Sequence, residues 1–181
     1  MRTALLVIDV QRAFFEAEPR PHEADAVVDR INALSSRARA AEVPVVVIQH
    51  EARTDQVEHG SPGWELEPRL AVVEHDARVR KTTPDSFLRT PLGGLLAAWG
   101  TERVVLCGYA SEFCIDTTAR RAAALGFAVV LASDAHTTHD APHLSAERIR
   151  AHHNATLPGI TSFGPAIEAR PSSEIVFARA G

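Results

Sequence analysis

Four short runs of apolar residues, rich in β-branched side chains, restrict the fold of this chain more than any other feature. They lie at residues 5–8, 43–48, 104–107 and 127–131, and stretches with helical spacing separate them. Strands that are apolar on both faces are typical of a parallel sheet with helices on both sides. We therefore expect an α/β protein: a three-layer α/β/α sandwich around a Rossmann-like, mostly parallel sheet of five or six strands.

The spacing of apolar residues and the positions of glycine, proline and serine predict the remaining elements. Helices are expected at residues 23–41, 87–99, 113–125 and 145–156, and further strands at 77–80 and 175–177. The 181 residues contain no repeat, low-complexity tract or linker, so a single domain over residues 1–181 is expected.

Composition and charge exclude several classes of protein. No apolar run approaches the ~20 residues that span a membrane, and a net charge of −4 without a basic stretch argues against nucleic acid as a partner. The first apolar run is too short for a signal peptide, and two cysteines do not make a disulfide framework. We therefore expect a cytoplasmic protein whose partner is a small-molecule substrate, with neither nucleic acid nor membrane involved.

Three reactive side chains follow predicted strands, where parallel α/β sheets place their sites. Asp9 follows the first run, Lys81 follows the strand expected at 77–80, and Cys114 lies where a loop leads into a helix. A helix N-terminus lowers the pKa of a thiol, and a carboxylate can serve as its general base. Alone, each residue also fits a structural role, as a buried thiol, a helix cap or a solvated cation.

Lys81 is the only lysine among 19 basic residues, and the other 18 are arginines. A compact ammonium can stand between a carboxylate and a thiol, where the planar guanidinium of arginine would not fit. The count alone does not establish such a role, but it marks Lys81 as a position to follow. Cys107, at the end of the apolar run 104–107, fits a buried structural cysteine and is assigned no role.

Three ordered segments resemble the isochorismatase-like cysteine hydrolases. Leu6-Val7-Ile8-Asp9-Val10-Gln11 with Phe14 is similar to the opening motif of that family, and Arg80-Lys81 with Ser86-Phe87 to its lysine motif. Residues 108–120, followed by 124–127 and 133–135, resemble its nucleophile segment. The resemblance spans about residues 4 to 136, most of the chain.

The resemblance implies a catalytic triad of Asp9, Lys81 and Cys114. Cys114 would attack a carbonyl-like carbon, Asp9 would take the thiol proton and later activate water, and Lys81 would support both. It also implies a cis peptide bond between Tyr109 and Ala110, and an oxyanion hole formed by the backbone N–H groups of Ala110 and Cys114. Family members often carry a hydroxyl residue at this bond, and here that hydroxyl is absent.

Nicotinamidases of this family carry an aspartate and two histidines as metal ligands after the second strand. Here that region reads Gln49-His50-Glu51, and the next histidine is His59, so we predict no metal and no cofactor, and disfavour a nicotinamidase. His136, His139 and His143 lie among threonines and a proline, which favours a loop at the pocket rim over a metal-binding helix face. Candidates to contact the substrate are Gln11, Phe14, His50, Trp64, Tyr109, Ser111 and Phe113.

These features predict a metal-independent cysteine hydrolase that acts on a C–N, amide-like bond of a small molecule through a thioester-type intermediate. By resemblance, it would be a homo-oligomer, either a dimer or a tetramer. Two alternatives stay open. One is an isochorismatase-type vinyl-ether hydrolase that relies mainly on Asp9; the other is a non-catalytic small-molecule-binding or redox-sensing domain with Cys114 as its reactive thiol.

Overall fold

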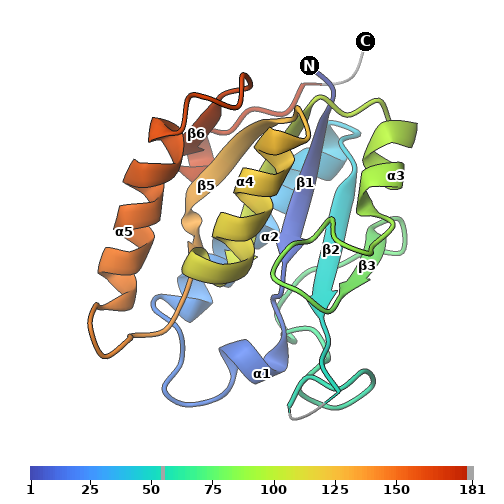
Figure 1. Ribbon diagram of the computed structural model, residues 1–181. Helices are drawn as coiled ribbons and strands as arrows, with labels where there is room; N and C mark the ends of the chain where they lie inside the picture. Colours follow the sequence, from blue (N-terminus) through green and yellow to red (C-terminus); the bar gives the residue numbers. More distant parts are fainter. Residues whose placement is uncertain (54–55, 179–181) are drawn as a thin grey trace.

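Six parallel strands form one sheet in the computed structural model, which describes residues 1–53 and 56–178 (Figure 1). The strands are β1 Thr3–Ile8, β2 Val45–His50, β3 Ala77–Lys81, β4 Arg103–Tyr109, β5 Ala128–Thr137 and β6 Ile167–Arg170. Their order is β3-β2-β1-β4-β5-β6, and every neighbouring pair is parallel. The chain moves outward from β1 to β3 and then returns to β4 beside β1, which creates a topological switch point.

Helices cover both faces of this sheet (Figure 1). They are α1 Arg12–Phe15, α2 Ala24–Ala40, α3 Leu92–Ala98, α4 Asp116–Ala124 and α5 Ala146–Thr156, with short turns η1 Ser111–Ile115, η2 Leu157–Gly159 and η3 Ser172–Glu174. The predicted three-layer α/β/α sandwich is therefore confirmed. Within the described residues, no helix has the length and apolar character needed to cross a membrane.

The side chains of β1 explain why the strands are apolar on both faces. Leu5 and Val7 pack in the core that α2 covers, whereas Leu6 and Ile8 pack in the core under α3 and α4. All four are fully buried or nearly so. Each such side chain contributes ~1.5–3 kcal/mol of hydrophobic free energy on burial. Apolar packing on both faces of the sheet therefore stabilises the central strand.

The edge of the sheet differs from the sequence-based expectation. The strand predicted at 175–177 is wrong, because β6 lies at Ile167–Arg170, where it pairs with β5. Its sequence, Ile-Glu-Ala-Arg, has one large apolar residue, as suits an edge strand, and therefore lacks the apolar run of the inner strands. Ile175 is buried in the α2-side core, while Val176 is 73% exposed.

Two predicted helices differ from expectation at their N-terminal ends. The helix predicted at 87–99 is shortened to α3, because Pro91 immediately precedes its first turn. The helix predicted from residue 113 begins as the wide turn η1, in which the Ile115 N–H bonds the Ala110 carbonyl, five residues back. His136, expected in a loop, lies in β5 and pairs with Gly108 of β4.

Gly108 permits the close approach of β4 to the end of β1. Its φ is +119°, and a Cβ there would lie 2.0 Å from the Ile8 carbonyl oxygen. We expect Gly108→Ala to lower the free energy of unfolding by more than about 2 kcal/mol in urea titrations. The control is Gly94→Ala in α3, which meets no atom within 4 Å; equal losses in the two variants would contradict this account.

Candidate active site

The C-terminal edge of the sheet brings together the three reactive residues predicted from the sequence. Asp9 directly follows β1, Lys81 ends β3, and Cys114 lies in η1 after β4. The Lys81 Nζ atom is 2.7 Å from Asp9 Oδ2 and 3.1 Å from Cys114 Sγ. Asp9 and Lys81 are 1% and 2% exposed, and Cys114 is 9% exposed. A buried ammonium thus joins a carboxylate to a thiol.

Lys81 has two further partners that the sequence did not indicate. Its Nζ atom lies 3.2 Å from the Thr83 carbonyl oxygen and 3.3 Å from His50 Nδ1. Burial and the charge of Lys81 lower the pKa of His50, so at neutral pH its imidazole is uncharged and its Nδ1 can accept from the ammonium. His50, predicted to contact substrate, thus lies against the lysine of the site.

The backbone at Asp9 aims its carboxylate away from the strand. Asp9 has φ +54°, a left-handed conformation that is sparsely populated by non-glycine residues. Its N–H donates to the Ile48 carbonyl and its carbonyl accepts from the Gln11 N–H. Its Oδ1 atom is buried and has no hydrogen-bond partner among the described residues. This oxygen is therefore the available acceptor beside the lysine.

The thiol of Cys114 is less acidic than its place before a helix led us to expect. Its pKa is raised to about 12: burial contributes most to the rise, the carboxylate of Asp9 adds to it, and Lys81 opposes both. The physical reason is charge balance. Asp9 and Lys81 already neutralise each other, so a thiolate would leave an uncompensated negative charge in a buried site. The resting thiol is therefore protonated.

The family of the chain follows from a comparison with known proteins. The family model of the isochorismatase domain matches residues 3–161. The chain belongs to the isochorismatase family. A streptothricin hydrolase of Streptomyces noursei is 44% identical over 140 residues, covering 77% of this chain and 51% of that relative. This isochorismatase-family chain therefore spans about half the length of that relative.

Solved structures share the fold of this chain. The crystal structure of an isochorismatase family protein is 30% identical, with a TM-score of 0.85 over 93% of this chain and 98% of the other. A cysteine hydrolase from Pseudomonas syringae pv. phaseolicola 1448A is 26% identical, with a TM-score of 0.85 over 96% and 90% of the two chains. The fold is thus shared along almost the whole length of both structures.

Two of the predicted substrate contacts have structural roles instead. Gln11 is fully buried; its amide donates to the carbonyls of His50 and Trp64 and accepts from the His50 N–H. Ser111 is also fully buried, and its hydroxyl bonds His136. Both polar groups are already engaged, so neither is available to a substrate.

The other predicted contacts are aromatic side chains with varied surroundings. The Phe14 ring stacks on Tyr109 with centroids 4.9 Å apart, and the Tyr109 hydroxyl bonds His139 Nδ1 at 2.9 Å. Phe113, next to Cys114 in sequence, is 59% exposed. The Trp64 ring is half-buried and lies edge-on to His59. The peptide bond between Tyr109 and Ala110 is cis, at the position that the family resemblance implies.

A cavity of about 540 Å³ lies beside the turn that carries Cys114. Tyr109 and Phe113 line one side of it, and the loop 138–144 and α5 line the other. Its volume suits a small ligand. A larger cavity, of about 780 Å³, lies near the start of β4 and β5. None of Asp9, Lys81 and Cys114 lines either cavity, and we associate the smaller one with the site because Phe113, which lines it, is adjacent to Cys114 in η1.

The part of the chain that the structure describes contains no group of three or more His, Cys, Asp or Glu side chains placed to hold a metal ion. After β2, the Gln49 amide donates to the Trp64 carbonyl, and His50 contacts Lys81. The donors that a nicotinamidase would need at this position are therefore replaced or engaged elsewhere.

The raised thiol pKa makes a prediction about alkylation. We expect the rate at which iodoacetamide modifies Cys114 to rise steadily through pH 9, because burial and Asp9 keep the native thiol protonated. An unfolded cysteine, with a pKa near about 8.5, would instead approach its plateau there. Peptide mass spectrometry across a pH series measures both states; a native plateau below about pH 8 would contradict the charge-balance argument.

Proposed function

We propose that this isochorismatase-family chain is a metal-independent cysteine hydrolase that cleaves a C–N, amide-like bond of a small molecule. The hydrolase class follows from its relatives in the family. The observation that carries the finer assignment is the position of Lys81 Nζ, within hydrogen-bond distance of both Asp9 Oδ2 and Cys114 Sγ. A nucleophile, a base and a cation in contact are the parts that covalent acyl transfer requires.

In the first half-reaction, Cys114 Sγ bonds to the carbonyl carbon while its proton passes to Asp9. The unpaired Oδ1 of Asp9 is the oxygen available to receive it. The negative charge that develops on the carbonyl oxygen would be held by the backbone N–H groups of Ala110 and Cys114. The tetrahedral intermediate then breaks its C–N bond, the amine leaves with the proton from Asp9, and a thioester remains on Cys114.

In the second half-reaction, Asp9 removes a proton from water as the water oxygen bonds to the thioester carbon. The C–S bond breaks, the carboxylic acid is released, and the sulfur regains a proton. Lys81 stays charged throughout: burial lowers its pKa, but the charges of Asp9 and Cys114 raise it by more. Its fixed positive charge therefore stabilises whichever partner is anionic at each step.

The thiol favours an amide over a vinyl ether. An amide offers an electrophilic carbonyl carbon to sulfur, whereas a vinyl ether must first be protonated on carbon, which needs an acid more than a nucleophile. The cavity beside Tyr109 and Phe113 would hold the part of the substrate that does not react.

Turnover of a substrate panel in the presence of EDTA tests this function. Streptothricin is the first compound to assay, because the relative from Streptomyces noursei is named for its hydrolysis; simple amides, ureides and isochorismate complete the panel. Metal-independent release of an amine supports the proposal. Hydrolysis of isochorismate alone would favour the vinyl-ether alternative, and no turnover with any compound would favour a binding or redox-sensing domain.

We also propose that the chain is cytoplasmic and forms a dimer or a tetramer. Both cysteines are free in the structure, as a reducing compartment would keep them. Light scattering coupled to gel filtration measures the assembly directly, and a monomer at micromolar concentration would contradict it.

A further inference from the structure

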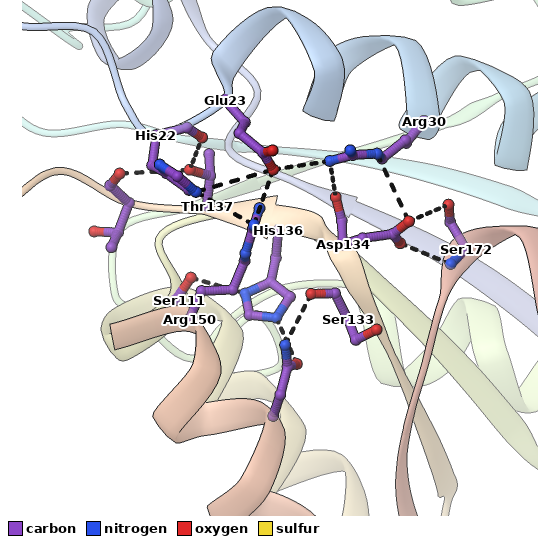
Figure 2. Close-up of polar contacts among 12 residues, drawn as sticks. His22, Glu23, Arg30, Ser111, Ser133, Asp134, His136, Thr137, Arg150 and Ser172 are labelled. Carbon is purple, nitrogen blue, oxygen red and sulfur yellow. Dashed lines mark hydrogen bonds and ion pairs between the residues drawn. The ribbon is translucent and has the colours of Figure 1, made fainter. Parts of the chain in front are cut away.

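A line of three hydrogen bonds runs from α5 to the turn that carries Cys114 (Figure 2). The Ser111 hydroxyl lies 2.7 Å from His136 Nδ1, and His136 Nε2 lies 2.9 Å from Asn154 Oδ1. The Asn154 amide nitrogen donates to the Ser133 carbonyl at 2.8 Å. Ser111 and His136 are fully buried. The proposed mechanism uses none of these four residues.

The last bond sets the direction of the other two. The Ser133 carbonyl can only accept, so the NH₂ group of Asn154 faces it and the Asn154 oxygen faces His136. His136 must therefore carry its proton on Nε2 and leave Nδ1 as an acceptor. The Ser111 hydroxyl consequently donates its proton to His136 Nδ1, and it cannot donate that proton to a group in the site.

The line ends on the turn whose shape places the nucleophile. Ser111 opens η1, and Cys114 is the fourth of its five residues. The next residue, Glu112, accepts from the Thr138 hydroxyl at 2.8 Å, which ties the same turn to the segment after β5. Wide turns of this kind are less regular than α-helix and occur often at functional sites. Side-chain ties to its first residues therefore restrict its conformation.

We propose that Ser111, His136 and Asn154 form a positioning relay that fixes η1 and thereby holds Cys114 Sγ against Lys81. The relay rests on the proposed function, because it serves the cysteine that would attack the substrate. Its three members are positioning residues, since they act through the turn and contact neither Asp9 nor Lys81 by any hydrogen bond in the described structure.

The relay needs His136 to be neutral, and its surroundings keep it so. The pKa of His136 is lowered to about 4: burial contributes most, the Asn154 bond and Asp134 of β5 oppose the shift, and Arg150 and His153 of α5 add to it. Figure 2 shows how the nearest charges are paired: Arg150 bonds Glu23, and Arg30 contacts both Glu23 and Asp134. From η1, Glu112 faces Thr138. At neutral pH the direction of the relay is therefore constant.

Ser111→Ala tests the relay at its end on the turn. We expect kcat to fall about 10²-fold with little change in KM, because a shift of the attacking sulfur costs rate more than binding. The matched control is Thr137→Val, the adjacent buried position in β5, whose hydroxyl bonds the His22 carbonyl on a different element. The control should keep its kcat. A loss of thermal stability in Ser111→Ala without a loss of kcat would overturn the proposal.

Asn154→Asp supplies a readout that a merely structural role would not move. The new carboxylate beside His136 would raise the pKa of the imidazole, whose protonated Nδ1 would then donate to Ser111 and reverse the bond. We expect kcat of this variant to fall as the pH drops from about 8 to 6, whereas the wild type shows no such step. Identical pH profiles of the two proteins would overturn the relay.

The iodoacetamide rate at Cys114 separates failure of the relay from failure of the proposed function. If Cys114→Ala keeps full turnover, the proposed nucleophile is wrong, but the relay still predicts an altered alkylation rate in Ser111→Ala and an unaltered one in Thr137→Val. An unchanged alkylation rate in Ser111→Ala would refute the relay whatever the fate of the nucleophile.

Discussion

Cys114→Ala is expected to lower kcat for amide hydrolysis by at least about 10⁴-fold, because the other thiol, Cys107, is fully buried within the sheet and cannot form the thioester in its place. The fold should survive, since removal of one partly shielded sulfur costs only about 1 kcal/mol. Stopped-time assays with purified protein, together with circular dichroism, measure both quantities.

Cys107→Ala is the matched control for that experiment. Cys107 is a second buried cysteine, held in β4 with its thiol facing the Leu6 carbonyl, and burial raises its pKa. Its replacement should leave kcat close to that of the wild type. If Cys114→Ala retained turnover, catalysis would have to depend on Asp9, as in the vinyl-ether alternative.

Lys81→Arg is expected to lower kcat by about 10³-fold while the protein still folds. The positive charge beside Asp9 is retained, but a planar guanidinium cannot occupy the space of an ammonium that is 2.7 Å from Asp9 Oδ2 and 3.1 Å from Cys114 Sγ. Lys81→Met should be less stable by ~3–5 kcal/mol, because it leaves the buried carboxylate without its partner.

The neighbouring residue provides the control for the lysine. Arg80 is exposed and makes only a 3.7 Å ion pair with Glu51, so Arg80→Lys should change neither kcat nor stability measurably. Full activity in Lys81→Arg would show that any cation suffices, and the rarity of lysine in this chain would then be without meaning.

Much of the fold could be predicted because the inner strands carry their signal locally. Each is an apolar run bounded by polar residues, and the order of strands in a parallel sheet places Asp9, Lys81 and Cys114 at one edge. The edge strand β6 carries no such signal. Backbone pairing to β5 supports it, and its four residues include one large apolar side chain, too few to make an apolar run.

The environment of the candidate site could not be predicted in the same way. The pKa of Cys114 depends on its burial and on the charges of Asp9 and Lys81. The residues next to Cys114 in sequence indicate neither of these. The sequence makes Gln11 a plausible substrate contact, but in the structure its side-chain amide makes three hydrogen bonds to backbone groups of other residues. His136 lies 22 residues after Cys114 in sequence, and the pairing of β5 with β4 brings it next to η1, where it bonds Ser111.

The central claim is that a covalent bond forms between the substrate and Cys114, and peptide mapping after acid quench tests it most directly. Enzyme mixed with an activated acyl ester and quenched within milliseconds is digested and analysed by mass spectrometry. Background acylation of lysine side chains is low, because the chain has a single lysine. The account predicts one acyl group on Cys114 that disappears as product accumulates. Turnover with an unmodified Cys114, or a label on another residue, would contradict it.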